Sequence, residues 1–424
     1  MLQIKNKEIR NASWLIVGKV FQMVLSLLMS IFTVRYLGPS NYGIINYVTA
    51  YVTFFTSLCT LGINSVIIKD FVDNPEQQGE AIGTSLALRG VSSILSAITI
   101  TGIVFVVDKG DKLILIVAIL CSMALFFQIF DTYNYWFQSR YESKVTAMAT
   151  LVAYIITSIY KIVLLLSGVG VQWFAFATSV DYIVVGVLLI IVYKRYRGPR
   201  LKVSRHKAKS LLGRSYHYIL SGMMVAIYGQ TDKFMLKHML DETSVGYYSL
   251  ATTISAMWVF VLQAIIDSMY PTILQLHKKD KEQFDRKNRQ LYAIVFYVSV
   301  VVGIIFCLLG EIVIQIMYGK EFLPAVSALK IVTWYTIFSY LGVARNAWIV
   351  CKNKQKYLKY MYILAAIANV FLNYICIPIW GMNGAAFASL ITQILTSIVI
   401  PYFIKDMRPN VRLMIEAIML KKIK

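Results

Sequence analysis

The chain has 424 residues, of which 58% are hydrophobic and only 15% charged, and its mean hydropathy is +0.64. A soluble domain of this length could not keep so much apolar surface from water, so the composition excludes a soluble globular protein. The net charge of +21 follows a pattern typical of membrane orientation, and we therefore expect no nucleic-acid partner.

Apolar runs of about 20 residues recur along the chain, which is the length a helix needs to cross a bilayer. They are too long and too uniformly apolar for barrel strands. The sequence therefore predicts an all-α integral membrane protein of about twelve transmembrane helices. The first run lacks a small-residue cleavage site, so we expect a span there rather than a signal peptide. The expected spans are 12–35, 44–68, 81–107, 113–137, 145–167, 172–193, 215–238, 247–269, 290–311, 324–350, 358–379 and 385–404.

Polar side chains recur at steps of three or four in the first, second and seventh spans, which places them along one face of each helix. The stripes include Lys19 and Gln22 in the first span, Asn64 in the second, and Gln230, Lys233 and Lys237 in the seventh. Hydrogen bonding between helices is the alternative reading of their Ser and Thr members. The charged members favour a polar path.

Basic residues inside spans are costly, at roughly 2.5 to 3.5 kcal/mol each even on a lenient scale. Lys19, Arg89 and Lys233 lie deep enough that we expect them to line a water-filled cavity. Lys161 is a weaker candidate for the same role. Arg345, like Lys330, is expected to extend its side chain to an interface.

Arg35 stands at the outer end of the first span, where it either meets phosphate or anchors the helix. Four acids lie in or near spans: Asp131, Asp181, Asp232 and Asp267. Each is expected to neutralise a nearby cation, and Asp232 to pair with Lys233. Proton or sodium coupling is the alternative for Asp232 or Asp181.

The basic residues outside the spans or at their ends are distributed unevenly between the two sides. With the N-terminus in the cytoplasm, 31 fall on the cytoplasmic side and 5 on the outer side. The positive-inside rule therefore predicts that both termini are cytoplasmic. The longest basic segment, 196–214, is expected to link an N-terminal six-helix lobe (1–195) to a C-terminal one (215–424).

The two halves also repeat. "GVQWFAFATS" at 170–179 matches "GMNGAAFASL" at 381–390, and "RYLGPSNYG" ending at Gly43 parallels "KHMLDETSVG" ending at Gly246. An even number of spans in each half gives both copies one orientation, so two lobes related about the membrane normal are expected.

Four segments resemble polysaccharide-export flippases of the multidrug/oligosaccharidyl-lipid/polysaccharide superfamily, Wzx type. These segments are "VRYLGPSNYGIINYVTAYVTFF" (34–55), "YWFQSRYESKVTAMA" (135–149), "TDKFMLKHMLDETSVGYYSLA" (231–251) and "MYGKEFLPAVSALKI" (317–331). The resemblance implies two lobes around a central cavity. It also implies alternating access that moves an undecaprenyl-diphosphate-linked oligosaccharide across the bacterial cytoplasmic membrane, for O-antigen, capsule or a related polysaccharide.

The partners implied are the lipid-linked oligosaccharide, membrane lipids, the glycan polymerase and the chain-length regulator. A drug or cation antiporter of the same superfamily is the alternative function, and such a protein would prefer acidic and aromatic cavity residues. A membrane enzyme is a third class, but no large external loop is expected. We find no catalytic constellation, metal-ligand spacing or cofactor motif, and none of the five cysteines forms a CxxC pair.

Overall fold

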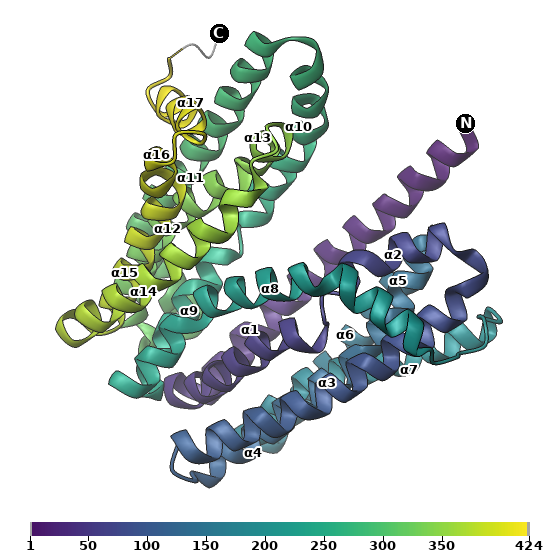
Figure 1. Ribbon diagram of the computed structural model, residues 1–424. Coiled ribbons are helices and arrows are strands. Elements are labelled where there is room, and N and C mark those ends of the chain that lie inside the picture. Colours follow the sequence, from purple (N-terminus) through teal and green to yellow (C-terminus); the bar gives the residue numbers. More distant parts are fainter. Residues whose placement is uncertain (1, 422–424) are drawn as a thin grey trace. The chain divides into compact units, whose positions relative to one another are not determined.

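The computed structural model describes the backbone of residues 2–421, and side chains from residue 22 onward except at positions 65, 221, 228 and 278 (Figure 1). Within these residues every regular element is a helix, so the chain is an all-α membrane protein as predicted. The α-helices are α1 (Leu2–Cys59), α2 (Asn64–Asp73), α3 (Gln78–Val107), α4 (Lys112–Phe127), α5 (Asp131–Ser139), α6 (Ser143–Ser167), α7 (Val171–Arg195), α8 (Arg205–Met239), α9 (Glu242–Ala256), α10 (Val259–Lys279), α11 (Lys281–Tyr318), α12 (Ala325–Ala344), α13 (Asn346–Cys351), α14 (Leu358–Trp380), α15 (Met382–Ile394), α16 (Ile400–Phe403) and α17 (Arg408–Ile418).

Ten stretches of the described helices are long and apolar enough to cross a membrane. The first of them, Gln22–Cys59, includes parts of both spans expected there, because α1 is two helices joined at Gly38 (φ 68°, ψ 174°). The expected seventh span lies in α8, which is continuous but too polar to be among the ten. These helices are consistent with the predicted count of twelve without establishing it.

Two span boundaries differ from the expectation. The second span ends at Cys59 rather than near residue 68, because Leu61 and Gly62 adopt positive φ angles and turn the chain into α2. The expected eighth span is divided between α9 and α10, which meet at Met257 and Trp258. Both windows are apolar on average, and hydropathy responds to composition rather than to backbone direction.

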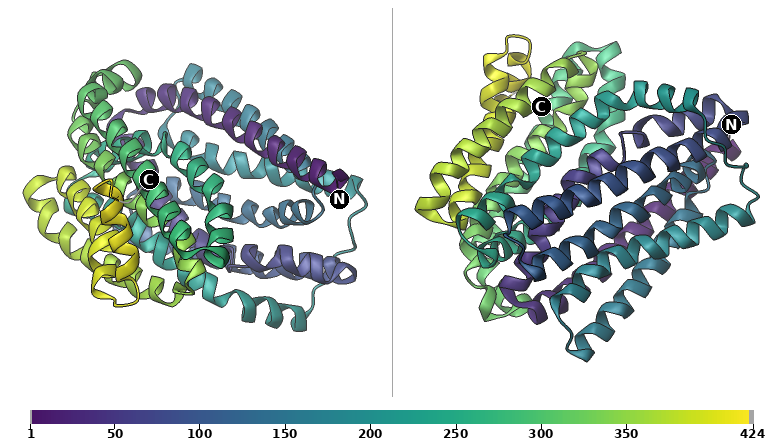
Figure 2. Two further views of the ribbon diagram at one scale, coloured as in Figure 1. Left: turned by 90° about the horizontal axis from the view of Figure 1, so that it is seen from above. Right: turned by 60° about the horizontal axis from the view of Figure 1, so that its bottom comes forward.

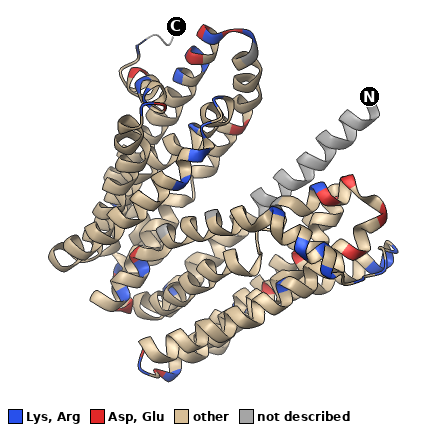
Figure 3. Ribbon diagram, viewed as in Figure 1, with Lys and Arg blue, Asp and Glu red and all other residues tan. Residues whose placement is uncertain are grey.

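The structure divides into two compact units. Unit 1 comprises Met1–Leu37 and Tyr47–Ala226, and unit 2 comprises Gly38–Asn46 and Ile227–Lys424. The lobe boundaries expected from the sequence, at 195 and 215, stay a prediction. Figure 3 shows that within each unit Lys, Arg, Asp and Glu gather at helix ends and in connecting segments, while the middles of the helices are nearly free of them.

In unit 1, α4 packs between α3 and α7, and α6 packs against α7 (Figure 2). A buried cluster at one end of this bundle joins α2, α3, α5 and α7. It contains Phe71, Ile82, Trp136, Phe137 and Tyr193. These large side chains hold the short helices α2 and α5 against the long ones.

The basic segment after α7 lies on α3 rather than forming a free linker. The Lys202 backbone N–H donates to the Gly79 carbonyl at 3.2 Å, and the Ser204 N–H donates to Thr84 Oγ1 at 3.0 Å. A Cβ at Gly79 would stand 2.2 Å from the Arg200 carbonyl oxygen. The absence of a side chain on α3 therefore lets this segment, residues 198–204, lie against the helix.

In unit 2, α11 and α12 pack side by side, and α12 also contacts α9 and α15. A buried cluster of this unit joins α10, α11, α12, α13, α14 and α17. Its fully buried members include Phe284, Tyr292, Leu341, Met361 and Met414. The amphipathic helix α17 is fixed on α11 by the Arg289–Glu416 ion pair at 2.8 Å.

Arg345 does not reach an interface, contrary to the expectation. The side chain is 1% exposed, and its Nη1 donates to the Thr396 carbonyl at 3.1 Å. Thr396 belongs to a π-helical turn, Leu395–Val399. Such a turn breaks the regular pattern of carbonyl acceptors, and the guanidinium supplies a donor there.

Corresponding turns recur about 210 residues apart, as expected for a repeated fold. The positive-φ pairs are Gly110 with Gly319, and Tyr141 with Asn353. The last pair closes similar segments, "NYWFQSRY" from residue 134 and "NAWIVCKN" from residue 346, each with a buried tryptophan. The repeat is therefore present in backbone geometry as well as in sequence.

Candidate functional site

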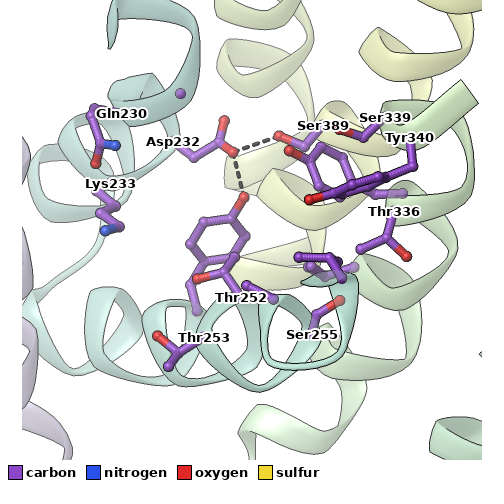
Figure 4. Close-up of a pocket in the computed structure, with 16 residues that line it drawn as sticks. Gln230, Asp232, Lys233, Thr252, Thr253, Ser255, Thr336, Ser339, Tyr340 and Ser389 are labelled. Carbon is purple, nitrogen blue, oxygen red and sulfur yellow. Dashed lines mark hydrogen bonds between the residues drawn. The ribbon is translucent and has the colours of Figure 1, made fainter. Parts of the chain in front are cut away.

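A polar cavity of about 460 Å³ lies inside unit 2, between α8, α9, α12 and α15 (Figure 4). α8 contributes Gln230, Asp232 and Lys233 to its wall. Serine, threonine and tyrosine side chains supply most of the remaining polar surface, among them Thr252, Ser255, Thr336, Ser339, Tyr340 and Ser389. A hydroxyl-lined cavity within a membrane-spanning bundle is the kind of place where polar substrate groups are received.

Asp232 is the centre of a buried hydrogen-bond network and is 7% exposed. The hydroxyls of Tyr248 and Ser389 donate to Oδ2. The amides of Asn373 and Asn369 donate to Oδ1, at 2.7 and 3.3 Å. An ionised carboxylate only accepts hydrogen bonds, and here both of its oxygens do so.

Lys233 points into the cavity on the side away from this network (Figure 4). Asp232 directs its oxygens to four neutral side chains, and no Asp232–Lys233 pair is among the ion pairs of the described residues. Lys233 therefore lines the cavity on the same helix as Gln230 without being held by Asp232. The expected charge pair stays a prediction.

Two other candidates of unit 2 lie outside the cavity wall. Lys237, one turn beyond Lys233, forms an ion pair with Glu242 at 2.6 Å. Asp267 is exposed and accepts from the Gln263 amide at 2.8 Å. Of the predicted stripe on α8, the structure thus places Gln230 and Lys233 in the cavity and pairs Lys237 elsewhere.

In unit 1, Arg89 is 2% exposed and serves as a donor to a break in the neighbouring helix. Its Nη2 donates to the Gln128 carbonyl at 2.9 Å, and its Nη1 to Thr132 Oγ1 at 3.0 Å. The chain there changes from α4 to a 3₁₀ turn, Gln128–Phe130. Arg89 thus has a clear structural role, and its place on a substrate path stays a prediction.

The other unit 1 candidates are dispersed over several helices. Asp181 accepts from Thr157 Oγ1 at 3.5 Å. Asp131 and Lys161 are half-buried on α5 and α6, and Gln22 is half-buried on α1. Arg35 and Asn64 are exposed, and Asn64 begins α2 instead of lying inside a span. The Lys19 side chain lies outside the described residues.

Sequence reasoning missed most of the Asp232 network. Asn369 and Asn373 stand four residues apart in α14, a spacing that places two amides on one helical face. Ser389 lies within the repeated segment but had no assigned role, and Tyr248 lay in a stretch noted only for its resemblance. The spacing of the two asparagines inside an apolar run was the detectable signal.

The described residues contain no cluster of three or more His, Cys, Asp or Glu side chains suited to hold a metal. The five cysteines are free thiols. The site is thus a hydrogen-bonding cavity with one buried carboxylate network inside a unit of membrane-spanning helices, an arrangement that suits a membrane transport protein.

Comparison with known proteins agrees with this class. The profile of the family described as polysaccharide biosynthesis protein matches residues 32–327. The chain belongs to that family.

Two curated relatives and two solved structures illustrate the similarity. The capsular polysaccharide biosynthesis protein CapF of Staphylococcus aureus is 19% identical over 94% of this chain and 99% of its own length. The probable flippase AglR of Haloferax volcanii is 25% identical over 58% of this chain and 51% of its own. An inward-facing MATE transporter of the MOP superfamily superimposes with a TM-score of 0.72 at 16% identity, covering 92% and 94% of the two chains. The lipid II flippase MurJ superimposes with 0.69 at 14% identity, covering 96% and 91%. The chain has the fold of this superfamily.

Proposed function

We propose that this protein is a flippase that carries an undecaprenyl-diphosphate-linked oligosaccharide from the inner to the outer face of the cytoplasmic membrane. The observation that carries the proposal is the hydroxyl-lined cavity with Lys233, which lies among the membrane-spanning helices of unit 2. A glycan cannot cross hydrocarbon without such a polar surface, whereas the lipid tail can remain in the bilayer. The family of the chain and the names of its relatives agree with it.

The remaining expectations belong to the same proposal. The protein would lie in a bacterial cytoplasmic membrane with both termini in the cytoplasm, supply O-antigen, capsule or a related polysaccharide, and work beside the glycan polymerase and the chain-length regulator. Alternating access would require unit 1 to contribute to the path, for which Lys19, Gln22, Arg35, Asn64, Arg89 and Lys161 remain the candidates. The basic asymmetry of the sequence supports the orientation.

A drug or cation antiporter is the alternative, since the MATE fold is shared. Cation substrates favour acidic surfaces, and the carboxylate of Asp232 is occupied by four hydrogen bonds while Lys233 extends into the cavity. The cavity therefore favours the glycan substrate.

Deletion of the gene tests the function. We expect lipid-linked repeat units to accumulate on the inner leaflet and surface polysaccharide to disappear, while synthesis of the repeat unit continues. Surface staining together with extraction of the lipid-linked pool would measure both. A deletion strain that assembles no lipid-linked unit would instead favour an enzyme, and one that only becomes drug-sensitive would favour the antiporter.

Asp232, which lies on α8 beside Lys233, is the candidate for ion coupling. Carboxylate and amide oxygens are ligands suited to a hard cation, and a carboxylate can equally carry a proton. Asp232→Asn keeps the shape of the side chain and removes its charge. If Asp232 couples an ion, this substitution removes the dependence of export on pH or sodium; an unchanged dependence with normal expression would leave Asp232 a structural group.

A further inference from the structure

The charges in the unit 2 cavity are balanced rather than strongly positive. Lys233 is the cation among the described lining residues, and Asp232 is the neighbouring anion. Diphosphates are multiply anionic and are usually held by several N–H groups or cationic side chains together. A single lysine beside a carboxylate is a poor match for such a group.

The hydroxyls of the cavity, in contrast, match the chemistry of a sugar. Thr252 and Thr336 donate their own protons to the backbone carbonyls of Ser249 and Thr333, at 2.9 and 2.6 Å. Their oxygens keep lone pairs that accept from a hydroxyl group of a ligand. Lys233, whose ammonium only donates, provides complementary donors.

Two polar atoms of the wall lack a partner within the described part of the chain. They are the Oγ of Ser255, whose side chain is 1% exposed, and the Oε1 of Gln230. Buried polar groups of native proteins are hydrogen-bonded as a rule, and an unpaired one destabilises the fold. Both residues line the cavity, so a rotation of either side chain would offer its unused hydrogen-bonding atom to a ligand there.

We propose that this cavity binds a sugar residue of the transported oligosaccharide through hydroxyl–hydroxyl hydrogen bonds and Lys233, and that the diphosphate binds outside it. The inference rests on the proposed flippase function and assigns the cavity to one part of the substrate. The volume of about 460 Å³ falls within the range of roughly 300–1,000 Å³ found for small-molecule sites.

Ser255→Ala tests the inference, because α9 offers a matched control. Ser249 lies on the same helix, is also 1% exposed, and also has a hydroxyl without a partner among the described residues, but it does not line the cavity. The ligand is the oligosaccharide released by mild acid from the lipid-linked pool of the strain that carries the gene. Calorimetry with the full-length protein in lipid nanodiscs measures its binding.

We expect Ser255→Ala to weaken oligosaccharide binding about 3- to 10-fold, as for loss of one hydrogen bond, and Ser249→Ala to leave it unchanged. Thr252→Val, which retains the side-chain shape, should act like Ser255→Ala. Inorganic pyrophosphate should not displace the oligosaccharide. Displacement by pyrophosphate, equal effects of the two serine variants, or no saturable binding of the oligosaccharide would each overturn the inference.

Export in cells separates this inference from the proposed function. If the wild-type gene restores surface polysaccharide to a deletion strain but the purified protein fails the binding test, only the sugar site is wrong. If deletion leaves surface polysaccharide intact, the flippase function itself is wrong.

Discussion

Two lysines of α8, one helical turn apart, have different surroundings. Lys233 extends into the cavity, whereas Lys237 is paired with Glu242 at 2.6 Å. Both fit the same sequence pattern, a polar stripe at helical spacing. The difference arises from α9, whose first turn brings Glu242 to Lys237, and a single helical periodicity contains no information about that neighbour.

Lys233→Ala should therefore reduce export roughly tenfold or more, the effect expected for losing a charged hydrogen-bond donor to substrate. Lys233→Arg should retain more activity because it keeps the charge. Lys330→Ala is the control, since Lys330 lies within a candidate span but not in the cavity wall. Surface polysaccharide per amount of membrane-inserted protein is the measurement. Full export by a well-expressed Lys19→Ala/Arg89→Ala/Lys233→Ala variant would contradict a cationic path.

The prediction of charged positions from sequence was informative in one respect and blind in another. It identified Arg89, Lys233 and Asp232 as charges that need a partner or water, because an unpaired charge is costly in lipid. It could not distinguish a cavity from a helix break, and Arg89 donates to the carbonyl of Gln128 at such a break. Breaks of this kind depend on backbone geometry, which composition does not specify.

At the scale of elements, two glycines from the repeated segments bring helices into backbone contact within unit 2. A Cβ on Gly43 would lie 1.8 Å from the Glu242 carbonyl oxygen, and one on Gly246 would lie 2.0 Å from that of Pro39. The hairpin tip Gly38–Asn46 therefore packs directly on the start of α9. The sequence comparison of the two halves paired these glycines as repeats, but only the structure gives the reason that neither position accepts a side chain.

Gly246→Ala should force these backbones apart and destabilise the protein by roughly 1–3 kcal/mol, as overpacking of a tight contact does. Gly102→Ala is the comparison, because Gly102 lies in α3 with nothing within 4 Å of the place that an added methyl group would take. That variant should be neutral or stabilised by about 0.5–1 kcal/mol. Thermal unfolding in detergent measures both, and equal melting temperatures would contradict the close contact.

The basic segment after α7 is held by an ion cluster on α2. Asp70, 2% exposed, pairs with Lys207 at 2.8 Å and with Arg214 at 2.6 Å. Burial alone would raise the pKa of Asp70, but the hydrogen bonds and charges of Lys207 and Arg214 lower it below the usual value of 3.8. The segment that sequence analysis treated as a linker is thus attached to unit 1 by charge as well as by backbone contacts.

Asp70→Asn should lower the melting temperature at neutral pH, because Lys207 would lose its buried counter-ion; the loss should be on the order of 3 kcal/mol. A carboxylate with a lowered pKa stabilises the fold fully above its unfolded-state value, and this contribution disappears as the pH falls through the lowered pKa. The melting temperatures of wild type and variant should therefore converge only in acid, below pH 3.8. Asp73→Asn, an exposed neighbour on α2, is the control. Convergence near neutral pH would contradict the pairing.

For the whole molecule, hydropathy was sufficient to predict the helical class but not the course of each helix. Apolar runs specified where helices lie, because lipid requires internally paired backbone. The turn at Leu61 and Gly62 and the break between α9 and α10 fell inside runs that hydropathy predicts as single spans. α8 shows the opposite case. Its polar residues, some of which line the cavity, exclude it from the ten apolar stretches, although α8 is a continuous helix.

Orientation in the membrane is a property of the whole chain that the distribution of charge predicts. Of the basic residues outside the expected spans or at their ends, 31 lie on one side and 5 on the other. Reporter fusions within 194–214 and at the C-terminus should therefore report the cytoplasm, and fusions within 109–112 or at Lys320 should report the outside. A phosphatase active only outside and a fluorescent protein active only inside give opposite signals at each site, so each fusion serves as a control for the other. An external report from 194–214 would contradict the predicted orientation, because the nine basic residues of that segment are the largest single contribution to the asymmetry.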